Sequence, residues 1–326
     1  SHHTAMEYAN LGKSGLRVSK ICLGCASFGT GEEWMLEMDE ARPIIDRAID
    51  LGVTFFDTAN TYSRGRSEEI LGEAIKGRRD DLVVATKVHP TMAGKSNRGG
   101  LSRVHVMRQI DASLKRLSID FMDLCHIHRW DYDTPIEETL RALDDLVRMG
   151  KTRYIGGSSM YAWQFAKALW TSDRLGITRF VSMQNHYNLC YREEEREMIP
   201  LCVDQGIGLI PWSPLARGFL TGKYKRGATP DSPRYRSDQN LVTRFFKPED
   251  FDVVEAVVEI AEEKGVRPAQ IALAWLFHKG VVATIVGATK VQHIEEAVDA
   301  LTIRLGSDEI KRLEAPYRPH PVMGAR

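Results

Sequence analysis

Short apolar runs alternate with longer segments of mixed polarity along most of the chain. Several of the short runs are apolar at every position, as Leu82–Ala85 is. Strands without polar alternation are typical of a parallel sheet that is covered on both faces. Eight strands are predicted, at Lys20–Leu23, Val53–Asp57, Leu82–Lys87, Phe121–Ile127, Tyr154–Ser158, Phe180–Gln184, Gly208–Trp212 and Val282–Val286.

Between these runs, apolar residues recur every three or four positions, which predicts amphipathic helices. These helices are expected at Asp39–Leu51, Glu68–Lys76, Arg103–Leu117, Pro135–Met149, Trp163–Leu175, Arg192–Gln205, Phe251–Lys264 and Pro268–Lys279. Two further helices, near Val291–Leu301 and Ser307–Leu313, follow the last strand. The segment Met6–Val18 contains two glycines and predicts a hairpin ahead of the first strand.

The regular alternation of strands and helices indicates parallel pairing through crossover helices. Eight such units predict an α/β protein with a single (β/α)8 TIM barrel, an N-terminal hairpin and two extra C-terminal helices. An open doubly wound sheet is the alternative, but no G-x-G-x-x-G follows the first strand. We expect residues 6–326 to form one domain, and Ser1–Ala5 to be a cloning remnant ahead of Met6.

Charge and composition narrow the classes of function. The 44 Lys and Arg residues balance 44 Asp and Glu residues among 326, so binding to nucleic acid or to an anionic membrane is not expected as the main role. The longest uncharged stretch, Tyr154–Ala166, is shorter than the ~20 apolar residues of a spanning helix. Five scattered cysteines fit reduced thiols and predict a cytoplasmic protein. The neutral net charge is compatible with a monomer or a homo-oligomer.

Polar side chains stand at several predicted strand ends, where the active site of a barrel lies. Asp57 ends the second strand with Tyr62 shortly after it, Lys87 ends the third, and His128 follows the fourth. A cation about 4 Å from a phenol, at an effective dielectric of about 20, lowers its pKa by roughly three units before desolvation of the lysine is counted. Asp57 is expected to hold Lys87 for this task, and His128 to donate a hydrogen bond to a substrate oxygen. These groups carry no hydride, so carbonyl chemistry needs a cofactor.

This set of residues resembles the aldo-keto reductases, in the style of the bacterial reductases that are similar to potassium-channel β-subunits. The resemblance extends from Met6 to about Leu313. It is carried by Phe56–Ala59, Tyr62, Gly65–Gly72, Ala85–Lys87, His126–Asp131, Gln184–Asn185 and Trp212–Leu215.

The resemblance implies a barrel that reduces aldehydes or ketones to alcohols with NADPH. The nicotinamide would supply hydride and Tyr62 the proton, while Lys87 and Asp57 tune that donor and His128 orients the carbonyl. The implied cofactor contacts are Ser158, Ser159, Gln184 and Asn185 at the carboxamide, Trp212 on the nicotinamide ring, the backbone of Ser213, Leu215 and Gly218 at the pyrophosphate, and Gly287, Thr289, Lys290, His293 and Glu296 at the adenosine half.

Two positions depart from the family pattern. His293 stands where relatives carry Arg or Gln, and Ala297 replaces a common Asn. A neutral histidine cannot clamp a 2′-phosphate bidentately as arginine does, so NADH is a second candidate cofactor, although Lys290 favours NADPH.

A basic segment provides independent support for an anionic cofactor. Between Arg217 and Lys247 there are eight basic residues against two acidic ones. This predicts a cofactor-covering loop at about 213–250, with a solvated surface loop as the alternative. Trp34 and Trp130 are expected to wall a pocket for a small neutral aldehyde or ketone.

Other functions remain open from the residues. A regulatory subunit of the same fold that senses the cofactor, without turnover or with slow turnover, would retain these motifs. A Schiff-base aldolase would use Lys87 as its nucleophile. His126 and His128 share a strand face, but a histidine that is hydrogen bonded inside the barrel is favoured over a metal ligand, and no metal is expected.

Overall fold

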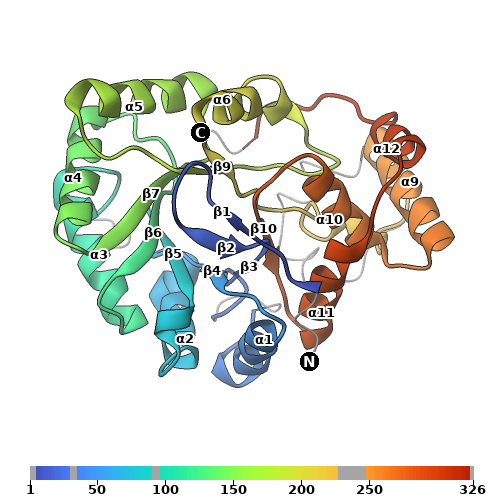
Figure 1. Cartoon of the computed structure of the whole chain (residues 1–326), viewed down its shortest axis with the longest axis horizontal. Helices are drawn as coiled ribbons and strands as arrows, with labels where there is room; N and C mark the ends of the chain where they lie inside the picture. Colours follow the sequence, from blue (N-terminus) through green and yellow to red (C-terminus); the bar gives the residue numbers. More distant parts are fainter. Residues whose placement is uncertain (1–4, 30–34, 90–95, 227–246, 324–326) are drawn as a thin grey trace.

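Eight parallel strands form the central sheet of the computed structural model, which describes residues 5–29, 35–89, 96–226 and 247–323 (Figure 1). Their spatial order is β10-β3-β4-β5-β6-β7-β8-β9, so strands that are consecutive along the chain are neighbours. The strands are β3 (Ile21–Gly24), β4 (Phe55–Asp57), β5 (Val83–Val88), β6 (Met122–Ile127), β7 (Thr152–Ser158), β8 (Ser182–Gln184), β9 (Gly208–Leu209) and β10 (Thr284–Gly287).

Backbone hydrogen bonds join the two ends of this order. The N–H of Val282 donates to the carbonyl of Leu209 at 3.0 Å, and that of Ile285 donates to Pro211 at 3.1 Å. The sheet therefore closes into a (β/α)8 barrel, and the prediction of this fold is confirmed. The alternative prediction of an open doubly wound sheet is wrong.

Helices surround the barrel, as Figure 1 shows. Those between and after the strands are α1 (Met38–Asp50), α2 (Arg66–Ala74), α3 (Arg103–Leu117), α4 (Ile136–Arg148), α5 (Ala162–Leu175), α6 (Met198–Gln205), α9 (Pro248–Lys264) and α10 (Pro268–His278). The two expected C-terminal helices are present as α11 (Val291–Asp299) and α12 (Ser307–Glu314). No helix in these described parts of the chain is long and apolar enough to cross a membrane.

One predicted helix is shorter than its sequence pattern. The segment Arg192–Gln205 forms a 3-10 turn at Glu193–Glu195, and α6 begins only at Met198. Pro200 explains the break, because its ring would clash with the carbonyl of Arg196 if a regular helix continued through that residue. In the first turn of α6, the missing N–H of Pro200 costs no hydrogen bond.

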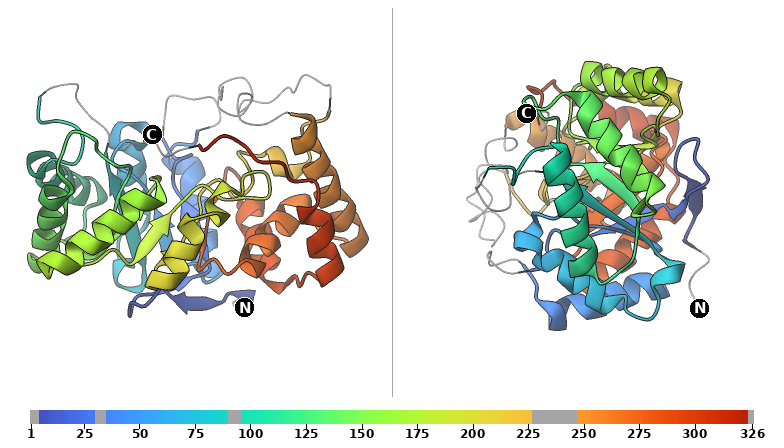
Figure 2. Two further views of the ribbon diagram at one scale, coloured as in Figure 1. Left: turned by 90° about the horizontal axis from the view of Figure 1, so that it is seen from above. Right: turned by 90° about the vertical axis from the view of Figure 1, so that its left-hand side faces the viewer.

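The predicted N-terminal hairpin is present and closes the floor of the barrel. Strands β1 (Tyr8–Asn10) and β2 (Arg17–Ser19) pair antiparallel, and Figure 2 shows them across one end of the barrel. Gly12 in their loop has φ 57°, and a Cβ there would lie 2.4 Å from the Gly206 carbonyl oxygen. Only glycine fits this close approach, which is fixed by the hydrogen bond from Lys13 N–H to that carbonyl at 2.9 Å.

The barrel interior has its own apolar cluster, separate from the core between strands and helices. Phe55, Ala85 and Leu124 belong to it, together with Leu11 of the hairpin loop. Side chains two positions apart on a strand share a face. The next inward positions toward the carboxyl ends of the strands are therefore Asp57, Lys87 and His126, so the sequence stacks polar side chains above an apolar plug.

Candidate active site

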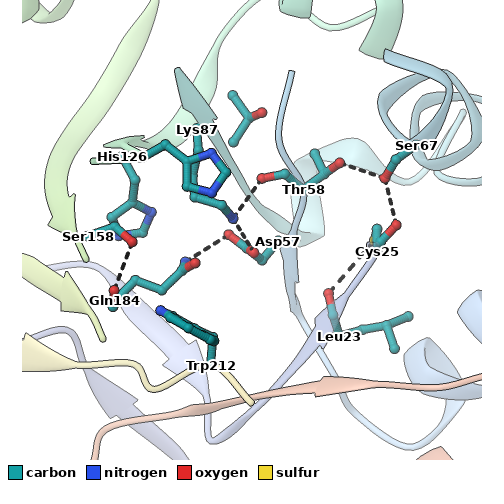
Figure 3. Close-up of polar contacts among 12 residues, drawn as sticks. Leu23, Cys25, Asp57, Thr58, Ser67, Lys87, His126, Ser158, Gln184 and Trp212 are labelled. Carbon is teal, nitrogen blue, oxygen red and sulfur yellow. Dashed lines mark hydrogen bonds and ion pairs between the residues drawn. The ribbon is translucent and has the colours of Figure 1, made fainter. Parts of the chain in front are cut away.

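A buried ion pair of Asp57 and Lys87 lies at the upper end of the barrel interior. Lys87 Nζ donates to Asp57 Oδ2 at 2.6 Å and to the carbonyl of Thr58 at 3.0 Å (Figure 3). Gln184 Nε2 donates to the other carboxylate oxygen of Asp57 at 3.1 Å. The side chains of Asp57 and Lys87 are 3% and 1% exposed, so each charge depends on the other.

The environment keeps Lys87 protonated. Burial is the largest single effect and acts to lower the pKa of Lys87, but the charges and hydrogen bonds of Asp57 and Tyr62 together outweigh it. The pKa therefore lies above its ordinary value of 10.5. A protonated lysine has no lone pair with which to attack a carbonyl. The ammonium is instead a fixed positive charge beneath the mouth of the barrel.

Tyr62 lies over this charge. It begins the 3-10 turn Tyr62–Gly65 between β4 and α2, and Lys87 Nζ is 5.0 Å from the centroid of its ring. Burial raises the pKa of Tyr62 above 10.0, and the opposing charge of Lys87 does not fully compensate. The lowered pKa that the charge of Lys87 predicts is wrong here, because the folded chain also removes water from the phenol itself. The phenol therefore retains its proton at neutral pH.

His128 follows β6 and meets Tyr62 edge to face, with ring centroids 6.3 Å apart and an interplanar angle of 89°. Its Nδ1 lies 2.9 Å from the carbonyl oxygen of His89. A carbonyl only accepts, so Nδ1 carries the hydrogen and the neutral ring leaves Nε2 as an acceptor. Burial, together with the charge of Lys87, lowers the pKa of His128 to about 3. This geometry differs from the expected donor role, because in this tautomer Nε2 has no hydrogen to give to a substrate oxygen.

The depressed pKa of His128 predicts a loss of stability in acid. Between its ordinary value of 6.5 and about 3, the unfolded chain binds a proton at this position and the folded chain does not. The free energy of unfolding is expected to fall through His128 by about 2.5 kcal/mol on going from about pH 7 to about pH 4.5. Denaturant unfolding at both pH values should show that His128→Gln loses less stability than the wild type. Equal losses would contradict the assignment.

His126 lies one layer below His128 and is fully buried. Its Nε2 is 2.8 Å from the hydroxyl oxygen of Ser182, and a Cβ at Gly156 would lie 2.5 Å from its ring. The prediction of a hydrogen-bonded histidine inside the barrel is confirmed. In the part of the chain that the structure describes, no three His, Cys, Asp or Glu side chains gather as metal ligands.

Two residues at the start of α2 brace the ion pair, and sequence reasoning used them only as family markers. Ser67 Oγ donates to the Cys25 carbonyl and lies within 2.7 Å of Thr58 Oγ1, as Figure 3 shows. Glu68 is fully buried and accepts hydrogen bonds from Thr86 Oγ1 and Arg116 Nε, both at 2.7 Å. The first turn of α2 thus holds the residues beside Asp57 and Lys87. Nothing in their spacing along the sequence signals this contact.

The expected carboxamide contacts form one connected group. Ser158 Oγ donates to the backbone carbonyl of Gln184 at 2.8 Å, and Trp212 Nε1 donates to Ser159 Oγ at 3.2 Å. The side-chain amide nitrogen of Gln184 donates to Asp57, so its carbonyl oxygen is the atom it offers to a ligand N–H. Asn185 is 2% exposed, and its polar atoms contact Glu194 only outside ordinary hydrogen-bond geometry.

The segment after β9 has an unusual backbone. Ser213, Ala216 and Arg217 have φ values of 52°, 50° and 56°, and Gly218 has 92°. Left-handed conformations cost non-glycine residues about 1 kcal/mol or more each, and they gather at ligand-binding turns. The Leu215 side chain is partly buried and packs against the outer core.

Three basic side chains gather beyond β10. Thr289 N–H donates to His293 Nδ1 at 3.2 Å, which leaves the ring hydrogen of the neutral form on Nε2. Burial lowers the pKa of His293, and the charges of Lys290 and Lys223 lower it further, against the opposing effect of Glu296. The sequence counted Lys223 only as part of the basic loop.

The rest of the adenosine-side group lies close by. Glu296 pairs with Arg267 at 3.4 Å, and Gly287 is exposed at the end of β10.

Of the two tryptophans predicted to wall the pocket, only Trp130 lies within the described residues. Trp130 lies 6.1 Å from Trp163, ring centroid to ring centroid, and Trp163 is 58% exposed at the start of α5. Trp34 lies outside the described residues. So do residues 227–246, most of the predicted cofactor-covering loop. At the near end of that loop, Arg226 pairs with Asp252 and Glu255 of α9 at 2.8 and 2.9 Å, so its positive charge is neutralised by the helix.

Comparisons with known proteins agree with the geometry. The model of the "Aldo/keto reductase family" matches residues 20–318. Versiconal hemiacetal acetate reductase of Aspergillus parasiticus is 42% identical, over 97% of this chain and 98% of that protein. Putative aryl-alcohol dehydrogenase C977.14c of Schizosaccharomyces pombe is 41% identical, over 97% of each chain. Aldo-keto reductase dtxS3 of Metarhizium robertsii is 40% identical, over 98% of this chain and 94% of that protein.

Proposed function

Because the chain belongs to the aldo/keto reductase family, and is therefore an oxidoreductase that acts on carbonyl or alcohol groups, we propose that it reduces aldehydes or ketones with NADPH. The observation that carries this proposal is the phenol of Tyr62, which retains its proton and whose ring centroid lies 5.0 Å from Lys87 Nζ at the mouth of the barrel. A proton donor next to a fixed cation suits a carbonyl oxygen that becomes an alkoxide.

The residues around this donor fit a nicotinamide cofactor, the kind that the family generally uses. The carbonyl oxygen of Gln184 and the buried amide of Asn185 complement a carboxamide, and Trp212 offers a flat indole for the ring. The left-handed turn from Ser213 to Gly218 is suited to a pyrophosphate. When bound, the reduced nicotinamide supplies hydride to the carbonyl carbon.

The chain's own residues supply the proton and control its charge. Tyr62 donates its phenolic proton to the carbonyl oxygen, and the Lys87 ammonium stabilises the phenolate that remains. Asp57 keeps Lys87 charged and oriented. His128 is neutral and has an acceptor at Nε2, so Tyr62 is the group that donates to the substrate oxygen. The His128 ring borders the pocket next to the phenol of Tyr62.

NADPH is proposed ahead of NADH because of the basic group beyond β10. Lys290 and Lys223 act together on His293, and a 2′-phosphate carries the charge that would balance them. The neutral His293 retains a donor at Nε2 for the same phosphate.

Aromatic carbonyl compounds are the proposed substrate class. Two relatives are named for aryl-alcohol oxidation or for reduction of a hemiacetal acetate. In this chain, Trp130 and Trp163 form an aromatic pair. Trp130 follows His128 by two residues, and Trp163 lies at the start of α5. Flat apolar side chains at a pocket mouth favour ring-bearing substrates.

The test mixes the purified protein with NADPH or, separately, with NADH, and with a panel of aromatic and short aliphatic aldehydes. The absorbance of the reduced nicotinamide reports oxidation of the cofactor. We expect aldehyde-dependent oxidation that is faster with NADPH at limiting cofactor. Binding of cofactor without turnover would favour a cofactor-sensing subunit. Consumption of a carbonyl without cofactor would favour an aldolase, which the protonated state of Lys87 argues against.

A further inference from the structure

Three aromatic rings form a continuous stack behind the proposed cofactor site. The imidazole of His186 lies 4.4 Å from the ring of Trp212 at 9°, and 4.3 Å from the ring of Tyr191 at 10°, on its other face. Tyr191 is fully buried and His186 is 3% exposed. One face of the Trp212 indole is therefore covered by protein, while its N–H is held by Ser159. The indole is fixed from one face and at one edge.

The far end of this stack is tied to the C-terminal residues. Residues 315–323, which we call the C-terminal strap, cross the face of the barrel opposite the hairpin (Figure 2). The Met323 N–H donates to the Tyr191 hydroxyl at 2.8 Å, and that hydroxyl lies 3.4 Å from the Met323 carbonyl. Tyr191 thus contacts two partners: its hydroxyl oxygen contacts the strap, and its ring contacts His186.

The strap is also anchored at two residues that precede Met323 along the chain. Tyr317 donates to the Glu193 carboxylate and accepts from the Arg192 backbone N–H at 2.9 Å. His320 Nε2 lies 2.8 Å from Asp250 Oδ1 at the start of α9, and both side chains are 2% exposed. Three prolines in the strap, Pro316, Pro319 and Pro321, restrict its backbone and reduce the entropy lost on docking.

We propose that His186 and Tyr191 are positioning residues that hold Trp212 flat for the nicotinamide, and that the strap holds Tyr191 in this register. The inference rests on the proposed function, because it gives Trp212 the cofactor ring as its ligand. A platform that is held before binding does not lose side-chain freedom when the cofactor arrives. The stack and strap therefore contribute to cofactor affinity rather than to the proton transfer at Tyr62.

Substitutions along the stack, with NADPH as the probe, test this inference. His186→Ala removes a ring pair and is expected to raise the Kd for NADPH about tenfold, whereas His186→Phe keeps a flat ring and stays within about threefold. Tyr191→Phe keeps the ring but loses the contact with Met323, and is expected to raise the Kd about threefold. The KM for an aldehyde at saturating NADPH should remain near the wild-type value in all three variants.

Tyr187→Phe is the matched control. Tyr187 is another buried tyrosine of the same loop, but its hydroxyl donates to Glu195 and its ring packs against Trp275, 5.3 Å away. This variant is expected to lower the Tm as Tyr191→Phe does, and to leave the Kd for NADPH unchanged. A shared fall in Tm with no difference in Kd between the two variants would overturn the inference and make the stack purely structural.

Deletion of residues 322–326 tests the part of the strap that contacts Tyr191. It should raise the Kd for NADPH as much as Tyr191→Phe, and the two changes combined should do no more than either alone, because they break the same contact. Additive effects, or no effect of the deletion, would overturn the role of the strap. A wild-type protein that binds neither NADPH nor NADH would remove the proposed function itself, whereas binding that is insensitive to every variant would remove only this inference.

Discussion

Tyr62→Phe is expected to lower the rate of carbonyl reduction by about two to four orders of magnitude, because it deletes the hydroxyl that gives its proton to the substrate oxygen. The phenyl ring still fits above Lys87 and against His128, so the shape of the pocket is retained. The Kd for NADPH should stay within about twofold of the wild-type value. Single-turnover reduction with bound NADPH measures the first quantity, and a fluorescence titration measures the second.

Tyr132→Phe provides the control for this experiment. Tyr132 is a tyrosine of the loop after β6, 60% exposed, whose hydroxyl accepts a hydrogen bond from Gln164 at 3.0 Å. Loss of its hydroxyl should leave the rate of reduction near that of the wild type. Normal turnover in Tyr62→Phe would remove Tyr62 from the role of proton donor.

Lys87→Met is expected to reduce both activity and stability. The phenolate left after proton transfer loses its cation, and reduction should slow by about two to three orders of magnitude. Asp57 also keeps its buried charge with only the Gln184 amide as a side-chain partner, which should cost about 3 to 5 kcal/mol in the free energy of unfolding. Single-turnover rates and denaturant unfolding measure the two effects separately.

The double variant Asp57→Asn, Lys87→Met separates the two effects. It removes both charges, so most of the lost stability should return, while the rate should stay as low as in Lys87→Met. Recovery of the rate together with the stability would mean that Lys87 acts only by supporting the fold.

The barrel and the polar layer above its apolar plug follow from patterns that a sequence displays directly. The short apolar runs mark the strands, and the period of two on each strand brings Asp57 and Lys87 to the inner face above Phe55 and Ala85. Pairing of neighbouring strands puts Asp57 beside Ala85, two positions before Lys87, so the long Lys87 side chain reaches the carboxylate. No contact between distant parts of the chain has to be known for this step.

The properties that sequence reasoning missed depend on surroundings that no motif encodes. The tautomer of His128 is set by the backbone carbonyl of His89, 39 residues away. The sign of the pKa shift of Tyr62 depends on how much water the folded chain removes from the phenol. The contact of Tyr191 with Met323 spans 132 residues and joins a loop to a segment beyond the barrel strands. Burial and long-range backbone contacts are tertiary features, so they emerge only from the fold.

Transfer of isotope from NADPH that carries deuterium at both C4 positions of its nicotinamide is the most direct test of the central claim. The protein, this cofactor and an aromatic aldehyde are incubated, and the alcohol is examined by NMR. We expect an alcohol with one deuterium on the carbinol carbon, formed in step with oxidation of the cofactor. An alcohol without deuterium, or bound NADPH that no aldehyde oxidises, would contradict the central claim.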